Sequence, residues 1–278
     1  MLTKKFPVLL GIGVLLLNTM LFGQPSDYDN NEWQSVQIEP GLTWKSFQST
    51  LDEDSLSINL LEVDLSLRNI NLIYDPKENH TTSAFATKND ALAAVNAGFF
   101  DMKNGGSVTY ILINGEIINE DTTGWGRAKL LNGAILKDKH GQVYIDEVKT
   151  NYWYDTTDYW EDILVTGPLL LENGGTTMYS QVPFNLKRHP RTAVCIDGDN
   201  QTLWLATIDG RHPQSAGMTI PELSMLMHSL GCQDAVNLDG GGSTTMWIEG
   251  EGVVNYPSDN QKFDHEGERP VSNVLIIK

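Results

Sequence analysis

The 278-residue chain contains few cysteines, few basic residues and, after residue 23, no apolar run long enough to cross a bilayer. Lys and Arg number 19 against 36 Asp and Glu, which gives a formal net charge of −17 at pH 7. Such a surface repels nucleic acid and anionic lipid, so we expect neither as a partner. The sequence also lacks a helix-flanked calcium loop and a histidine pair at zinc-binding spacing, so no metal site is assigned. With 40% hydrophobic residues, the chain has an ordinary globular composition.

The two cysteines, Cys195 and Cys232, each lie in an apolar stretch. In an exported protein they could form a disulfide, whereas two buried thiols are equally ordinary in apolar surroundings. The sequence leaves both states open.

The first 23 residues have the build of a secretory signal peptide. Two lysines precede an almost unbroken apolar run without an acid, and Gly23 is a small residue at the expected cleavage site. The run also approaches spanning length, so an uncleaved membrane anchor is the alternative. We predict a signal peptide over 1–23, and hence a secreted, periplasmic or cell-surface protein without stable membrane insertion after cleavage. Residues 24–36, which are polar and acidic, are predicted to be a flexible linker.

Short β-type segments bounded by turn residues dominate the rest of the chain. Residues 58–75 alternate in polarity as one long strand or two short ones. Asn114-Gly115 between apolar flanks predicts a tight hairpin, because this dipeptide accepts the positive φ angles that such turns need. This hairpin lies within residues 107–120, and hairpins of similar design are predicted within 134–146 and 192–210.

Helix is scarce by comparison. Residues 219–231 are the clear case, because Thr219 and Glu222 match a capping box and a glycine follows the last apolar position. A second, weaker helix is predicted within 82–90. No repeat or composition break divides residues 37–278, so we predict one α+β domain with a large, mostly antiparallel or mixed sheet and few helices.

Several β-type runs stop abruptly at Asn, Asp or Arg close to a glycine or proline. Strand ends hold side chains firmly while leaving them open to a ligand. If these ends converge, they build a pocket that contains carboxylates, two arginines and exposed backbone amides. The candidate residues are Asn96, Arg191, Asp209, Arg211, Asp239, Ser243 and Asn273.

The segment "NLDGGGSTTM" (237–246) is the most unusual of these strand ends. Gly240, Gly241 and Gly242 let backbone N–H groups come close to an anionic or heavily hydroxylated ligand, with Asp239 at the rim. Arginine offers a forked donor for phosphate, and a few arginines in one pocket can override a distant negative field. Together these residues indicate a site for a sugar phosphate.

From about residue 60 to the C-terminus, the chain resembles the phosphodiester glycosidases related to a mammalian enzyme that removes N-acetylglucosamine from a phosphodiester. The resemblance rests on "NAGFFD", "RTAV" followed by "IDGR", the helix that leads into "NLDGGGSTTM", and "RPVSN". The chain departs from the family at Cys195, where glycine is expected, and it shows no cysteine-rich, membrane-anchoring tail. The resemblance implies a pocket of Asn96, Arg191, Asp209, Arg211, Asp239, Gly240, Gly241, Ser243 and Asn273.

The resemblance also implies hydrolysis of the bond between an anomeric carbon and a phosphodiester oxygen. The substrate would be a glycosyl phosphodiester, such as one of α-linked N-acetylglucosamine, on a glycan or envelope polysaccharide. Arg191 and Arg211 would bind the phosphate and stabilise its growing charge. Asp239, ahead of Asp209, would act as nucleophile or base at the sugar carbon. The glycines and the polar pocket residues would hold the substrate.

The same residues allow two other enzymatic interpretations. A divalent cation, calcium or magnesium, could be held by Asp239, Asp209 or Asp101. A serine hydrolase built on Ser243 is disfavoured, because Thr245 stands where a nucleophile elbow has glycine.

The alternative from another class is a non-catalytic module that binds polysaccharide. The chain has seven tryptophans, and residues 151–162, "NYWYDTTDYWED", are either an exposed aromatic loop for stacking on sugars or a flap packed on the body. An enzyme would release free sugar, whereas a binding module would return its ligand intact.

Overall fold

The computed structural model describes residues 33–49, 55–120 and 130–278. The predicted signal peptide and most of the predicted linker lie outside these residues. Strand β1 begins at Gln34, so the last three positions of the predicted linker, 34–36, belong to a strand of the domain. No helix in the described ranges combines the length and apolar character that a membrane span requires.

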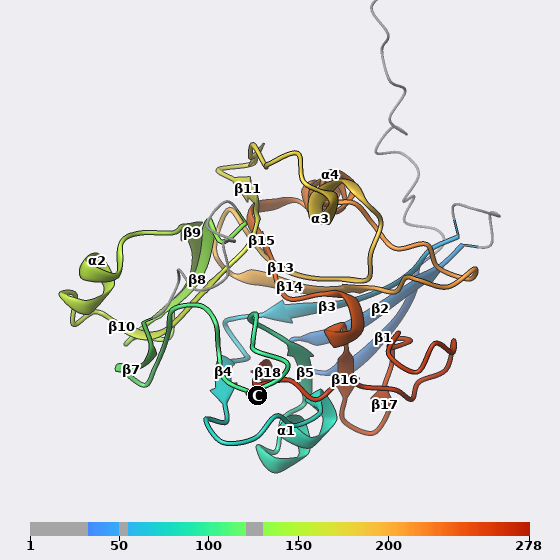
Figure 1. Cartoon of the computed structure of the whole chain (residues 1–278), viewed down its shortest axis with the longest axis horizontal. Helices are drawn as coiled ribbons and strands as arrows, with labels where there is room; N and C mark the ends of the chain where they lie inside the picture. The colour runs from blue at the N-terminus through green and yellow to red at the C-terminus, as the bar shows by residue number, and fades with distance from the viewer. Residues whose placement is uncertain (1–32, 50–54, 121–129) are drawn as a thin grey trace, which may run out of the picture.

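Three antiparallel sheets make up the domain (Figure 1). The largest has eight strands in the order β1 Gln34–Glu39, β2 Leu42–Gln48, β3 Ser57–Asp64, β14 Thr202–Ile208, β13 Arg191–Asp197, β15 Cys232–Asn237, β11 Leu169–Glu172 and β12 Gly175–Thr176. The second runs β7 Glu116–Asn119, β6 Ile111–Ile113, β10 Trp160–Thr166, β8 Gly133–Asp138 and β9 Val143–Glu147. The third runs β17 Gly252–Val253, β16 Met246–Ile248, β5 Ala93–Asn96, β18 Asn273–Ile277 and β4 Ile70–Tyr74.

The few helices lie on the outside of these sheets. They are α1 Thr82–Lys88, α2 Asn151–Asp155, α3 Pro183–Leu186 and α4 Ile220–Ser229. The 3-10 turn η3 Gly241–Ser243 instead lies in the connection between β15 and β16, with Gly242 and Ser243 buried. In Figure 1, α3 and α4 cover one face of the large sheet, and α2 lies beyond the far end of the second sheet. The structure therefore confirms the predicted α+β domain with mostly antiparallel strands.

Alternation along the central strand β13 explains the two main cores. Val194 and Ile196 face a core that all three sheets share, whereas Ala193 and Cys195 face the core under α4. Successive side chains of a strand point to opposite faces, so one apolar strand covered on both sides serves both cores.

The predicted local elements are present. Asn114 and Gly115, with φ of 52° and 75°, form the tip of the β6–β7 hairpin, as positive φ angles at both positions require. The hairpins β8–β9 and β13–β14 also form. Residues 58–75 contain two strands, and the turn between β3 and β4 carries the chain from the large sheet to the third sheet.

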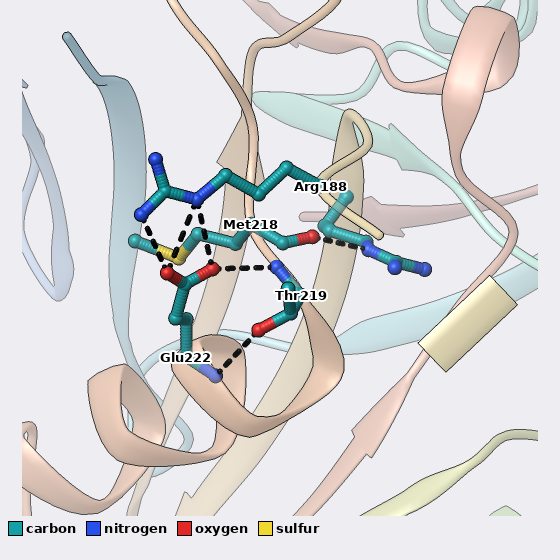
Figure 2. A network of polar contacts seen from close by, with 5 residues as sticks. Arg188, Met218, Thr219 and Glu222 are labelled. Atoms are coloured by element: carbon teal, nitrogen blue, oxygen red, sulfur yellow. Dashed lines mark hydrogen bonds and ion pairs between the residues drawn. The ribbon is translucent and has the colours of Figure 1, made fainter. Parts of the chain in front are cut away.

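Helix α4 begins with the predicted capping box (Figure 2). The Glu222 carboxylate accepts the Thr219 N–H at 2.8 Å, and the Thr219 hydroxyl accepts the Glu222 N–H at 3.2 Å. Arg188 donates to the same carboxylate through Nε and a terminal nitrogen, the latter at 2.7 Å. Glu222 thus also ties Arg188, in the segment before β13, to the helix.

Cys195 and Cys232 form a disulfide between the neighbouring strands β13 and β15. Both cysteines belong to the core under α4. The sequence left this pairing open, and the tertiary structure provides it because β15 returns antiparallel to β13.

We expect the disulfide to contribute about 2–4 kcal/mol to stability, since it closes a long loop of the unfolded chain. Reduction, or the double substitution Cys195→Ala with Cys232→Ala, should lower the thermal unfolding midpoint by about 5–10 °C. Thiol titration of the denatured, unreduced protein should detect no free cysteine. Two reactive thiols in that titration would contradict the pairing.

Candidate functional site

The glycine-rich segment crosses from the large sheet to the third sheet, between β15 and β16. Its backbone is hydrogen-bonded on both sides as it crosses. The Asp239 N–H donates to the Ala97 carbonyl at 2.8 Å, just beyond β5, and the Gly241 N–H donates to the Pro190 carbonyl at 2.9 Å, just before β13. The ends of three strands distant in sequence therefore meet at this segment, as the sequence predicted.

Each of the three glycines has a steric reason. A Cβ on Gly240 would stand 2.7 Å from the Pro190 carbonyl oxygen. Gly241 has a φ of +65°, and a Cβ there would stand 2.7 Å from a terminal nitrogen of Arg211. A Cβ on Gly242 would overlap Asp259 and Arg269. The glycines thus admit one backbone carbonyl and two guanidinium groups rather than serving as a simple flexible loop.

Asp239 lies at the partly exposed start of this segment. One of its carboxylate oxygens accepts the Gly240 N–H at 2.9 Å, and its backbone carbonyl accepts the Asn96 side-chain amide at 2.6 Å. Since the Arg211 guanidinium lies against Gly241, it borders the same short loop that carries the Asp239 carboxylate.

Arg211 is exposed and directly follows the Asp209-Gly210 strand end. Within residues 33–49, 55–120 and 130–278, no hydrogen bond or ion pair engages its guanidinium. The pKa of nearby His189 is lowered, first by burial and then by the positive charges of Arg191 and Arg211. Arg211 therefore retains the forked donor set that binds phosphate.

Arg191 does not match its predicted role. Its side chain is 1% exposed, and its guanidinium donates to the backbone carbonyls of Met218 at 2.9 Å, Phe184 and Lys187. The ring of Phe184 covers the guanidinium at 4.8 Å. Figure 2 shows the Met218 carbonyl that takes part in this anchoring. Arg191, which the sequence predicted to bind phosphate, is thus buried, and its hydrogen bonds hold α3 and the chain before α4 to β13.

Asp209 is also enclosed. Its carboxylate accepts hydrogen bonds from the Ser57 hydroxyl at 2.7 Å, the Asn255 amide at 2.9 Å and the Tyr256 N–H at 2.8 Å. Burial raises its pKa to about 6, and the three hydrogen bonds oppose this rise. The side chain joins β3 and the segment after β17 to the end of β14, so its surroundings favour a structural role over the predicted catalytic one.

The two predicted asparagines lie behind the glycine segment. Asn96 accepts the Thr192 hydroxyl at 2.7 Å and the Thr245 N–H at 3.1 Å, in addition to its bond to Asp239. Asn273 accepts the Gly98 N–H and donates to Ser272. Both are fully buried, so they hold the strand ends together and do not face a ligand.

Ser243 ends the turn η3 and is also buried. Its hydroxyl has no hydrogen-bond partner among the described residues, and the same holds for the hydroxyls of Thr244 and Thr245. Unpartnered buried hydroxyls are uncommon, and these three side chains retain donors and acceptors that the described part of the protein does not use.

Sequence reasoning missed Arg269, although it lies in the "RPVSN" motif. Its Nε and a terminal nitrogen donate to the two carboxylate oxygens of Asp259 at 2.7 and 2.6 Å, and this pair lies against Gly242. Only the spatial approach to the glycine segment identifies it, because the motif alone drew attention to Asn273.

A column of stacked rings was also missed. His212, Phe263, Tyr256 and His265 stack in that order, with centroids 5.0, 3.8 and 4.5 Å apart. The column begins next to Arg211 and holds the chain after β17 close to the site.

The acids named as alternative metal ligands do not gather. Across the ranges that the structure describes, no group of three or more His, Cys, Asp and Glu side chains could hold a metal ion. The Asp101 carboxylate instead accepts the N–H groups of Lys103 and Asn104 within its own turn.

The aromatic segment 151–162 combines the two states that the sequence left open. Tyr154 and Trp160 are buried in a core with Tyr110 and Leu136. Tyr152, Trp153 and Tyr159 are exposed, by 77%, 39% and 42%. The segment is therefore a packed flap with an aromatic outer face.

We expect Arg191→Lys to destabilise the protein by about 2–4 kcal/mol, because lysine cannot reproduce the fork that satisfies three carbonyls. Arg188→Lys, which alters a partly exposed ion pair, is the matched control and should cost about 1 kcal/mol or less. Urea unfolding measures both. If Arg191→Lys had native stability and only weaker substrate binding, Arg191 would be a ligand-binding residue after all.

The raised pKa of Asp209 predicts a specific pH dependence. From its ordinary value of 3.8 up to about 6, the native state keeps a proton that the unfolded state releases. The stability of the protein relative to Asp209→Asn should therefore fall as pH rises through this window and stay level above it. Urea unfolding of both proteins between these limits measures the difference. A relative stability that rises with pH would contradict the raised pKa of the buried Asp209 carboxyl.

Comparisons with known proteins identify relatives of this fold and sequence. The family model for phosphodiester glycosidases matches residues 89–278. N-acetylglucosamine-1-phosphodiester alpha-N-acetylglucosaminidase of Bos taurus is 28% identical over 183 residues, which are 66% of this chain and 30% of that protein. The SPbeta prophage-derived uncharacterized protein YomE of Bacillus subtilis is 41% identical over 68 residues, 24% of this chain and 10% of its own length. The chain thus spans under a third of either curated relative.

Solved structures share the fold. The zebrafish N-acetylglucosamine-1-phosphodiester alpha-N-acetylglucosaminidase catalytic domain, auto-inhibited by its pro-peptide, has a TM-score of 0.71 at 22% identity and covers 88% of this chain and 87% of its own. A putative exported protein from Burkholderia pseudomallei has a TM-score of 0.58 at 16% identity, over 80% of this chain and 74% of its own. With a family model that matches more than half of its residues, the chain belongs to the phosphodiester glycosidase family.

Proposed function

We propose that the protein is an exported hydrolase that cleaves a sugar, α-linked N-acetylglucosamine, from a glycosyl phosphodiester of a glycan or envelope polysaccharide. The observation that carries the proposal is the loop that bears Asp239 and the three glycines and that the guanidinium of Arg211 approaches at Gly241. Family membership and the name of the bovine relative support the choice of substrate. The Cys195–Cys232 disulfide supports export, since such bonds persist in oxidising compartments.

In this mechanism the bond between the anomeric carbon and the phosphodiester oxygen breaks, and the electron pair leaves with the phosphate monoester. Arg211 stabilises the negative charge that grows on the phosphate. Asp239 acts on the opposite side, either attacking the sugar carbon itself or taking a proton from the attacking water. Water finally supplies the hydroxyl of the free sugar. The N–H groups of Gly240 and Gly241 are bonded to the Asp239 carboxylate and the Pro190 carbonyl, so the glycines contribute by placing Asp239 and by leaving room for Arg211.

The exposed rings of Tyr152, Trp153 and Tyr159 favour a second candidate, a non-catalytic module that binds polysaccharide. The two candidates differ in their product, because only the enzyme releases free reducing sugar from a glycosyl phosphodiester.

We expect Asp239→Asn to lower kcat by about 10²–10⁴ on a phosphodiester of α-N-acetylglucosamine, because the amide can neither attack nor take a proton. Release of free N-acetylglucosamine measures the rate. Asp199→Asn, the same change at an exposed hairpin tip, is the matched control and should retain full activity. Near-normal turnover of a folded Asp239→Asn protein would exclude this residue as the catalyst, and intact substrate with the unaltered protein would favour the binding module.

A further inference from the structure

The Arg269–Asp259 ion pair lies on Gly242, next to the loop that carries the proposed catalytic aspartate. Both contacts of the fork are short, 2.7 and 2.6 Å, and a Cβ on Gly242 would overlap both side chains. The remaining terminal nitrogen of Arg269 lies 3.7 Å from the sulfur of Met102, an exposed residue. The pair therefore occupies space that the third glycine of the triplet leaves open.

Two arginines thus flank adjacent glycines. The terminal nitrogen of Arg211 contacts the Cβ position of Gly241, and that of Arg269 contacts the Cβ position of Gly242. Both guanidinium groups therefore border the same short stretch of backbone. Arg211 has no polar partner in the described part of the chain, whereas the fork of Arg269 holds a carboxylate.

Two hydroxyl groups without partners belong to residues next in sequence to Gly242 and Asp259. The Ser243 hydroxyl follows Gly242 and the Ser258 hydroxyl precedes Asp259, and neither has a hydrogen-bond partner among the described residues. Ser243 is fully buried. A ligand rich in acceptor oxygens would satisfy hydroxyl donors that the protein itself leaves unused.

The ion pair can be reached from solvent. The side chains of Arg269 and Asp259 are 20% and 35% exposed, so an anion can approach the fork and compete with the carboxylate. A phosphate group presents more charge and more acceptor oxygens than a carboxylate, and it fits the same planar fork. Exchange of the Asp259 carboxylate for a phosphate therefore retains the geometry of the fork and strengthens the contact.

We propose that Arg269 is a second phosphate-binding residue beside Arg211, and that the Asp259 carboxylate occupies its fork until the phosphate of the substrate displaces it. This inference deepens the proposed function, because the phosphate is that of the glycosyl phosphodiester. Arg269 takes the place that the sequence assigned to Arg191, whose guanidinium is bound to backbone carbonyls. Asp259 acts as a built-in competitor that sets the affinity for phosphate.

Titration calorimetry with inorganic phosphate tests this without any turnover. Arg269→Gln should weaken phosphate binding about tenfold or more, because the fork is lost. Asp259→Asn and Asp259→Ala should each tighten it about three- to tenfold, because the competing carboxylate is gone. Two controls keep the charge change but lie elsewhere: Arg188→Gln removes a forked arginine near α4, and Asp158→Asn removes an exposed acid paired with Lys139. Both should bind phosphate like the unaltered protein.

Unchanged or weaker phosphate binding by both Asp259 variants would overturn the proposal, as would native affinity in Arg269→Gln or no detectable phosphate binding by the unaltered protein. An equal gain in affinity in Asp158→Asn would also overturn it, because the effect would then come from net charge alone. Thermal unfolding of each variant identifies loss of fold, and the two Asp259 variants guard against failure of one. The proposed glycosidase reaction is judged separately by release of sugar, so either idea can fail while the other holds.

Discussion

The loop between β15 and β16 is held from both sides by backbone hydrogen bonds, one to the end of β5 and one to the start of β13. The approach to Pro190 is possible because Gly240 has no side chain, since a Cβ there would stand 2.7 Å from the Pro190 carbonyl oxygen. Any Cβ in this stretch would push apart the carbonyl of Pro190 or the arginines that lean on the loop. The position of Asp239 relative to Arg211 depends on this close approach, and the proposed chemistry depends on that position.

Around this loop, most of the polar residues that converge serve the fold. Strand ends and irregular connections leave backbone groups without ladder partners, and buried groups of this kind must be paired. Arg191 satisfies three carbonyls, Asp209 accepts the Tyr256 N–H, and Asn96 receives the Thr245 N–H. Such a shell keeps the few exposed groups in place, which a site for a charged ligand requires. The enclosed polar residues and the exposed ones are therefore two layers of one arrangement.

Local elements were predictable because their stabilising contacts lie within a few residues. The capping box joins Thr219 to Glu222, and the tip at Asn114-Gly115 needs only the conformational tolerance of those two residues. Residues 58–75 were ambiguous for the opposite reason. Strand β3 pairs with β2 and with the distant strand β14, and β4 pairs with the distant strand β18, so long-range pairing places the two strands in different sheets.

The candidate site shows the same division. The glycine triplet was predictable as a place of close backbone approach, and the set of motifs was sufficient to indicate the family. The roles of the charged residues were not, since a guanidinium is equally suited to a phosphate and to a cluster of carbonyls. Arg191 became an anchor because α3 and the chain before α4 bring three carbonyls to it. Arg269 was overlooked because its contact with Gly242 spans a long stretch of chain.

The sequence by itself determined the capped helix α4, the hairpin tips, the acidic character and the need for bare backbone after Asp239, because these follow from local chemistry and composition. The tertiary structure alone decided the disulfide and which charged groups face solvent. Burial and pairing depend on which distant segments pack together, and that information is spread over the whole chain rather than written at any one position.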